Sequence, residues 1–487
     1  MKNKVLLLVP PVKKSETSEG ELINVGVFPP LGLAYIASSL KKNHKINIKI
    51  IDALAENLSE EALLKKVSEF SPSIIGITVL TQQIEMALSF SKKVKCQKLC
   101  KFIVLGGPHV HFEHENLIKD SNVDVCVRGE GEITFSELVD ALMEGTDLSQ
   151  IKGITYKEKN GGCKINEDRP FMKNLEQIPF PDRGLLNNNL YKAPISLGGE
   201  KAFTSILATR GCPFKCHFCS LSKMWKSMQR RRSVENVLDE IGELYEKSKI
   251  VAFSFVDDLL VADKKWAMEL CRGLCERGLN KKIIWDCCGR IKLMTPELLK
   301  EMKKAGCRCV IYGIEFGSQR MLDFINKRIT IEDIHKTISM TNKVGIPIKG
   351  LFMMGYPTET KETLQDTLNL AKSLRMDFFT VSIVSPYPGT ELYNYCVERN
   401  MLVEYNWIDI MQIRHSAIKL EHLTLEEVIE YINRLMRECM MQPSYMIHMI
   451  LKHPKKAIIF GPKLLRKALE NYLLLYSKNS KNKIFSK

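Results

Sequence analysis

The 487-residue chain lacks the features that mark membrane-spanning and secreted proteins. No window holds the ~20 uninterrupted apolar residues that a membrane-spanning helix requires. No secretory signal precedes the first strand-like run, because Met1-Lys-Asn-Lys4 leads directly into Val5–Val9. We therefore expect a cytoplasmic protein, in which most of the 15 cysteines are free thiols. The 45% hydrophobic and 26% charged residues are ordinary for a soluble globular protein, and the length suffices for two or three domains.

Acidic residues are almost absent from the end of the chain. From Lys452 onward there are ten Lys or Arg residues and a single acid, Glu470, within a net charge of +15 for the whole chain. This excess favours an acidic electron donor of the flavodoxin or ferredoxin type, or a peripheral contact with an anionic membrane through a basic amphipathic helix, and no nucleic acid. The alternative is a helix over Ala457–Tyr476 that packs on the rest of the protein, followed by a lysine-rich tail.

Three cysteines stand close together in the stretch Thr209-Arg-Gly-Cys-Pro-Phe-Lys-Cys-His-Phe-Cys-Ser220. Closely spaced thiolates hold iron–sulfur clusters, and a 4Fe-4S cluster held by Cys212, Cys216 and Cys219 has one iron left for a substrate. A zinc site would need a fourth ligand, and the spare candidate, His217, lies inside the cysteine loop. The other cysteines are interpreted mainly as core residues. A second cluster is the alternative for four of them: Cys287, Cys288, Cys307 and Cys309.

The spacing C-x3-C-x2-C, with Phe218 before the last cysteine, resembles the signature of the radical S-adenosylmethionine (SAM) superfamily. This resemblance implies that the open iron chelates SAM through its amino and carboxylate groups. It also implies that one electron from the cluster cleaves SAM to methionine and a 5′-deoxyadenosyl radical.

Residues 1–150 alternate short apolar runs with helical patterns, which predicts a Rossmann-like, doubly wound parallel sheet. The expected strands are Val5–Val9, Ile46–Ile51, Ile74–Thr78, Phe102–Leu105 and Val123–Val127. Helices are expected to begin near Leu31, Ser59, Gln83, Glu115 and Glu132. Polar and Gly-rich residues follow the strands, where such a sheet builds its ligand crevice.

The loops after the fourth and fifth strands, together with Pro29-Pro-Leu-Gly-Leu-Ala-Tyr35, resemble the cobalamin-binding domain of a large class of radical SAM enzymes. The cofactor-binding residues implied by this resemblance are Gly106, Gly107, Pro108, His109, Gly129, Glu130 and Gly131. The loop Pro10–Pro30 has no histidine, so the D-x-H-x-x-G motif that supplies a cobalt ligand in many cobalamin domains is missing. The alternatives for His109 and His111 are hydrogen-bonded or solvated loop residues, and for the domain a fold that has lost its cofactor.

Residues 151–195 are expected to form a hairpin and a linker, and residues 196–415 a partial (β/α)6 barrel of the TIM type. The predicted barrel strands are Thr204–Ala208, Val251–Phe255, Ile283–Asp286, Val310–Ile314, Ile348–Met353 and Phe379–Ile383. Reactive groups in barrels gather at the carboxyl ends of the strands. With the family resemblance, this rule implies a SAM site formed by Phe218, Asp257, Asp258, Glu315, Ser318, Gly355 and Pro357, while no catalytic residue is assigned. Residues 416–487 complete the chain as a helical basic extension, with a helix expected from about Thr424 to Met440.

The resemblance implies a cobalamin-binding radical SAM enzyme, with methyl transfer to an unactivated carbon as the preferred reaction. The first alternative is a radical cyclisation or rearrangement of a large porphyrin-like or lipid-like substrate. The second, from another class, is a binding protein that senses cobalamin or redox state.

Overall fold

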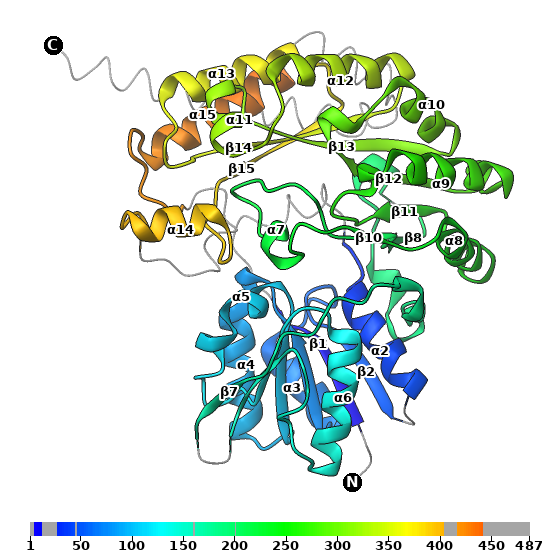
Figure 1. Ribbon diagram of the computed structural model, residues 1–487, viewed down its shortest axis with the longest axis vertical. Helices are drawn as coiled ribbons and strands as arrows, with labels where there is room; N and C mark the ends of the chain where they lie inside the picture. The colour runs from blue at the N-terminus through cyan, green and yellow to red at the C-terminus, as the bar shows by residue number, and fades with distance from the viewer. Residues whose placement is uncertain are drawn as a thin grey trace.

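A computed structural model describes residues 4–11, 27–43, 46–158, 161–199, 201–403 and 416–441. The chain is built around two sheets, one in each half, and helices cover both (Figure 1). The α/β architecture with parallel sheets agrees with the fold expected from the sequence.

The first sheet has seven strands in the order β2-β1-β3-β4-β5-β6-β7. They are β1 (Lys4–Val9), β2 (Asn47–Asp52), β3 (Ile74–Thr78), β4 (Phe102–Gly106), β5 (Val125–Val127), β6 (Ile154–Lys157) and β7 (Cys163–Ile165). The first five strands pair in parallel, as predicted, and run with their carboxyl ends at one edge. The predicted hairpin is present as β6 and β7, and it extends this sheet through an antiparallel pairing of β6 with β5.

Helices cover both faces of the first sheet, which makes it a three-layer unit. They are α2 (Leu31–Asn43), α3 (Glu60–Phe70), α4 (Ile84–Cys96), α5 (Pro108–Leu117) and α6 (Gly131–Glu144). The strands are apolar on both faces, so Leu7 packs against the α2 and α6 side while Leu6 packs against the α3 and α4 side. The prediction that the fourth helix begins near Glu115 is wrong. Gly107 turns the chain with a φ of 103°, and Pro108 then occupies the first helical turn, where its missing N–H costs nothing.

The second sheet has six parallel strands in the order β15-β14-β13-β12-β11-β8, as expected for successive β/α units. The strands are β8 (Phe203–Ile206), β11 (Ala252–Phe255), β12 (Ile284–Gly289), β13 (Cys307–Glu315), β14 (Ile348–Met354) and β15 (Phe378–Ile383). A two-stranded antiparallel pair, β9 (Thr209–Arg210) and β10 (Arg230–Arg231), follows β8. All six predicted barrel strands are present.

The helices of this half begin where short polar side chains cap them. The larger helices are α8 (Val234–Ser248), α9 (Lys264–Glu276), α10 (Pro296–Lys304), α12 (Ile331–Val344), α13 (Lys361–Ser373) and α15 (Leu425–Met440), and the shorter ones are α7 (Leu221–Met224), α11 (Gln319–Phe324) and α14 (Glu391–Glu398). Thr295 accepts a hydrogen bond from Leu298 N, while Thr330 and Thr424 form capping boxes with Asp333 and Glu427. The start of α15 at Thr424 confirms the helix expected there from the sequence.

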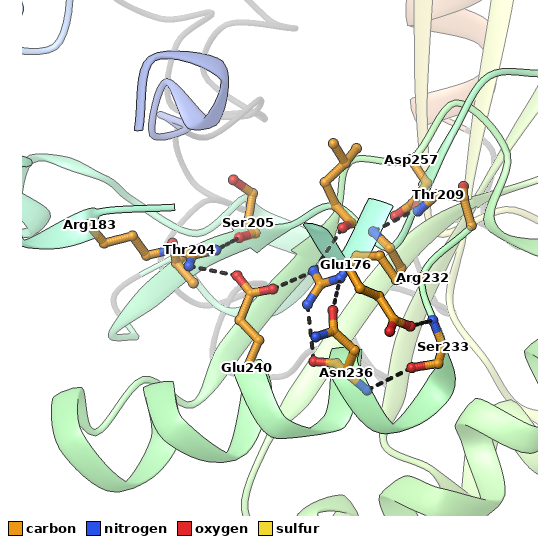
Figure 2. Close-up of polar contacts among 12 residues, drawn as sticks. Glu176, Arg183, Thr204, Ser205, Thr209, Arg232, Ser233, Asn236, Glu240 and Asp257 are labelled. Atoms are coloured by element: carbon orange, nitrogen blue, oxygen red, sulfur yellow. Dashed lines mark hydrogen bonds and ion pairs between the residues drawn. The ribbon is translucent and has the colours of Figure 1, made fainter. Parts of the chain in front are cut away.

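Buried ion pairs anchor the linker between the two halves to the second sheet (Figure 2). Glu240 of α8 lies between two arginines, with Oε1 2.7 Å from Arg183 Nη1 and Oε2 2.5 Å from Arg232 Nη1. Arg183 belongs to the linker, and its Nη2 donates to the carbonyl of Ser205 in β8 at 2.8 Å. All three charged side chains are buried. One carboxylate therefore holds the linker and the start of α8 in register with the first barrel strand.

Among the helices of the described residues, none combines the length and the apolar character that crossing a bilayer requires. The predicted amphipathic helix and basic tail after Lys452 lie outside the described residues.

Replacing Glu240 by glutamine should lower the free energy of unfolding by about 3–5 kcal/mol, because it leaves two buried arginines without a carboxylate. Lys41→Gln is the matched control: it removes the exposed Lys41–Asp182 pair and should cost only about 0–1 kcal/mol. Urea titrations followed by circular dichroism measure both. Equal losses in the two variants would contradict the assigned role of Glu240.

Candidate active site

The three signature cysteines lie in a loop whose base is closed by the β9–β10 pair. The backbone of Arg210 in β9 lies opposite that of Arg230 in β10 in this antiparallel pair, so the loop begins and ends at neighbouring positions. Gly211 directly precedes Cys212 with a φ of 96°, and a Cβ there would lie 2.0 Å from the carbonyl oxygen of Met228. Only glycine fits this close approach. Glycine at position 211 is therefore a geometric requirement of the loop.

Two aspartates after β11, the buried Asp257 and the half-buried Asp258, hold the backbone of this loop. Asp257 Oδ1 accepts hydrogen bonds from Ala208 N, at 3.0 Å, and from Thr209 N. Asp258 Oδ2 accepts from Gly211 N at 2.9 Å. Burial raises the pKa of Asp257 to about 7 and also raises that of Asp258. Asp257 Oδ2 is buried without a protein partner, so this one oxygen remains available for the predicted contact with SAM.

The residues present fit an iron–sulfur cluster. Cys212, Cys216 and Cys219 are free thiols close enough to influence each other electrostatically, and burial raises the pKa of Cys212 and, to about 12, that of Cys219. Such thiols must lose their protons on binding iron, so cluster loading releases protons. No three potential ligands among the described side chains converge on one metal ion. A cluster has no such need, because each thiolate binds a different iron.

The end of β13 carries a strained glutamate beside the cysteine loop. Glu315 has a φ of 68°, which is rare for a residue with a side chain, and a register shift in the β13–β14 pairing precedes it. Its Oε1 lies 2.5 Å from Lys327 Nζ, and both side chains are buried. Lys327 Nζ in turn lies 5.7 Å from the ring centre of Phe218. The predicted SAM residues Glu315 and Phe218 are thus brought together through Lys327.

The loop after β14 is held from within by a buried glutamate. Glu359 Oε2 accepts from Gly355 N at 2.6 Å and from Tyr356 N at 2.9 Å, while its Oε1 has no partner. Burial raises the pKa of Glu359 to about 8. The predicted residues Gly355 and Pro357 lie in this loop, and Ser318 directly precedes α11 after the neighbouring strand, without a side-chain hydrogen bond to the helix end. Their contacts with SAM remain predictions.

Among the described residues, the structure gives no support for a second cluster and places two nearby tyrosines in packed surroundings. The four cysteines considered for a second cluster do not meet: Cys287 and Cys307 pack in the core between sheet and helices, whereas the neighbour Cys288 points to the opposite face of β12. Tyr312 is part of the same core and bonds Thr341 of α12 at 2.8 Å. Tyr356 packs against Phe316 and Phe324. Packing therefore explains both tyrosines.

Two glycines and two histidines lie at the carboxyl edge of the first sheet. Gly107 lies so close to Val79 that a Cβ would come within 2.9 Å of its backbone, whereas a Cβ on Gly129 would meet no atom within 4 Å. His109 is buried in α5 with Nδ1 3.2 Å from Thr81 Oγ1, and burial lowers its pKa to about 4. His111 Nδ1 accepts from Gly129 N at 3.2 Å. This open, glycine-bearing edge fits a large cofactor held without a histidine on its metal.

A buried charge cluster joins this edge to the cysteine loop. Arg210 forms ion pairs with both carboxylates: Nη1 lies 2.6 Å from Glu130 Oε1, and Nη2 lies 2.5 Å from Glu132 Oε1. Arg230 Nη1 lies 2.8 Å from Glu130 Oε2. The side chain of Glu130, expected in the cofactor site, is therefore committed to the junction between the halves. A second contact lies between α5 and the loop before α14, where Phe112 packs so tightly on Gly389 that a Cβ there would come within 2.3 Å of the ring.

Sequence reasoning missed several residues of this site. Arg210, Arg230 and Lys327 have no motif that distinguishes them from surface cations. Arg290 does have a signal in the sequence. It directly follows β12, the third barrel strand, and reactive groups in barrels gather at the carboxyl ends of the strands. Its guanidinium Nη1 lies 3.8 Å from Cys216 Sγ.

A cavity of about 450 Å3 lies elsewhere. Its lining includes Asn188, Lys192, Lys201 and Phe203, at the amino end of β8. The cysteines follow the carboxyl end of that strand, so this cavity is not part of the site described above.

Two family models match the chain. The radical SAM superfamily model matches residues 206–371, and the B12 binding domain model matches residues 25–139. The first range contains the cysteine loop and four of the six barrel strands in full, β11 to β14, and the second contains β2 to β5 with the loops that follow β4 and β5.

Curated relatives and solved structures extend over most of the chain. An uncharacterized methyltransferase of Pyrococcus horikoshii is 36% identical over 92% of this chain and 95% of its own length. The anaerobic magnesium-protoporphyrin IX monomethyl ester cyclase of Rubrivivax gelatinosus is 31% identical over 76% of this chain and 66% of the cyclase. The radical SAM methyltransferase TsrM of Kitasatospora setae, solved with cobalamin and a 4Fe-4S cluster, aligns with a TM-score of 0.66 at 18% identity, over 83% of this chain and 79% of TsrM. At that identity the match establishes the shared fold.

Replacing Cys212, Cys216 and Cys219 together by alanine should abolish iron binding after anaerobic reconstitution, since it removes every thiolate of the loop. The control replaces Cys96, Cys163 and Cys275, which lie outside the loop, by serine and should keep the wild-type iron content. Iron and sulfide assays with visible absorption measure the outcome. A full complement of iron in the alanine variant would overturn the assignment.

Glu359 should make stability depend on pH in a specific direction. Because its folded-state pKa is raised to about 8, its contribution is fully present below its ordinary pKa and is lost as pH rises through about 8. Glu359→Gln keeps an oxygen for the two backbone N–H groups but does not titrate. Urea unfolding between about pH 5 and pH 8 should therefore show a steeper loss of stability for wild type than for the variant, and parallel curves would refute this.

Proposed function

Because the chain belongs to the radical SAM superfamily and carries a B12-binding domain, we propose that it is a cobalamin-dependent enzyme that methylates an unactivated carbon of a small molecule. The relative from Pyrococcus horikoshii, which matches nearly end to end, is named a methyltransferase. TsrM, which shares the fold, is a methyltransferase solved with both cofactors.

One observation carries the proposal: the cysteine loop and the carboxyl edge of the B12-type sheet meet at a buried junction. Arg210 lies two residues before Cys212 and is paired with Glu130 and Glu132, which flank Gly131 at that edge. Methyl transfer needs the group that carries the methyl and the group that activates the substrate in one space. A contact between the two loops supports this arrangement.

When bound, the cluster supplies the electron that cleaves SAM, and cobalamin supplies a transferable methyl group. The chain itself orients these groups and keeps water out. Cys212, Cys216 and Cys219 hold the cluster, and Asp257 and Asp258 fix the loop on which they stand. We assign Phe218, Glu315, Ser318, Gly355 and Pro357 to the SAM pocket, and the edge formed by Gly106–His109 and Gly129–Gly131 to cobalamin.

Partners follow from charge and from the relatives. A net charge of +15 favours an acidic flavodoxin-type or ferredoxin-type protein as electron donor, and the basic tail favours either that donor or an anionic membrane surface. The relatives include the magnesium-protoporphyrin ester cyclase and a hopanoid C-3 methylase of Methylococcus capsulatus. We therefore propose a small-molecule substrate of the pigment or lipid class.

Radical cyclisation without methyl transfer is the second candidate, favoured by the 31% identity with the cyclase of Rubrivivax gelatinosus. The two reactions differ in the fate of the SAM methyl group. In methyl transfer this group ends on the product, whereas in a cyclisation it leaves with methionine.

The test is an anaerobic incubation of the reconstituted enzyme with cobalamin, reductant, an extract of lipids and pigments, and SAM carrying a trideuterated methyl group. We expect a product in which a trideuterated methyl group replaces one hydrogen of the precursor, with all three deuterium atoms retained. The alanine variant of the three signature cysteines is the control and should give no such product. Formation of 5′-deoxyadenosine together with an altered product that carries no deuterium would contradict methylation and support radical cyclisation.

A further inference from the structure

Arg290 is a buried arginine that faces the cysteine loop. It follows β12 directly, and its guanidinium carbon lies 3.6 Å from the ring centre of Phe214, which stands between the first two signature cysteines. Its Nη1 donates toward Cys216 Sγ at 3.8 Å, and its Nη2 donates to the carbonyl of Lys327. The contacts with Phe214 and Cys216 hold the side chain against the loop, and the hydrogen bond to Lys327 fixes it from the other side.

The surroundings of Arg290 differ from those of every other buried arginine or lysine in the described part of the chain. Each of the others forms an ion pair with a carboxylate: Arg128 with Asp168, Arg183 and Arg232 with Glu240, Arg210 with Glu130 and Glu132, and Lys327 with Glu315. Arg290 forms no ion pair with a described carboxylate, and its charge is directed at a thiol and a carbonyl. An uncompensated buried charge is strongly unfavourable, so the site requires an anion.

An iron–sulfur cluster supplies that anion. Three thiolates and the inorganic sulfides give the cluster a negative charge that grows by one on reduction. Positive charge and hydrogen bonds at the cysteine sulfurs stabilise the reduced form and raise the reduction potential. Arg290 offers both at Cys216, and its charge also acts on Cys212.

We infer that Arg290 is the counter-cation of the cluster site and raises the reduction potential of the cluster through Cys216. Arg290 is therefore a positioning residue: it acts on the reduction potential through the cluster ligand Cys216 and does not itself touch the substrate. The inference rests on the cluster-binding part of the proposed function and is independent of methyl transfer.

Binding of the SAM carboxylate is the competing role for a cation at this place. The stacking on Phe214 argues for the cluster, because it ties the guanidinium to the loop that carries the ligands. The two roles separate experimentally, since a cluster-tuning arginine acts before SAM is present.

The test is a redox titration of the reconstituted full-length protein, followed by electron paramagnetic resonance, first without SAM and then with it. Arg290→Gln should shift the midpoint potential to a more negative value without SAM, and Arg290→Lys should shift it less, because it keeps the charge but loses the planar fork. Lys215→Gln is the matched control: it removes the same charge from the cysteine loop at an exposed position, where water screens it, and should stay near the wild-type potential.

Iron per chain keeps the test decisive if a variant assembles poorly. Loss of cluster in folded Arg290→Gln, with loading restored in Arg290→Lys, also supports the inference. A wild-type potential in loaded Arg290→Gln, a shift that appears only when SAM is added, or equal loss of cluster in Arg290→Gln and Arg290→Lys would each overturn it.

Discussion

The ion pairs between Arg210 and the two carboxylates Glu130 and Glu132 connect the parts of the protein on which its chemistry depends. Arg210 and Glu132 are buried and the side chain of Glu130 is only 9% exposed, so each charge has lost most of its hydration. Buried pairs of this kind contribute little net stability, because desolvation offsets the attraction, but removing one partner is costly. These ion pairs therefore act mainly on geometry. They permit one arrangement of the two loops and disfavour arrangements in which one of the charges has no partner.

The same principle recurs around the cysteine loop. Its backbone is held by carboxylates from the next strand, its aromatic residues contact Lys327 and Arg290, and its base is closed by a glycine against Met228. A loop that carries a cluster must keep its thiolates in place while protons leave and charge changes. Contacts from the ends of several strands hold the cysteine loop in place. This requirement explains why so many titratable groups are buried at one edge of the second sheet.

Much of this architecture could be predicted from sequence, because it follows from periodicity and from closely spaced motifs. The six barrel strands, the parallel first sheet and the cysteine loop are local patterns. The direction of a side chain is not local: Asp257, Asp258 and Glu130 were placed at the correct edges, yet their carboxylates turn to the loop backbone and to the domain junction. The fourth helix began earlier than expected because the turn at Gly107 and the proline after it outweighed the apolar pattern. Pairings across long sequence separations, such as Arg183 with Glu240, leave no local signal.

The proposed function requires that the iron–sulfur cluster and the corrinoid share one site across the junction formed by Arg210, Glu130 and Glu132. Electron paramagnetic resonance of the reduced protein loaded with both cofactors tests it most directly, because two nearby paramagnetic centres alter each other's spectrum and relaxation. We expect such coupling between the reduced cluster and the cobalt(II) corrinoid in the wild-type protein, and its loss when Arg210 is replaced by glutamate. Two independent spectra from a fully loaded wild-type protein would contradict the account.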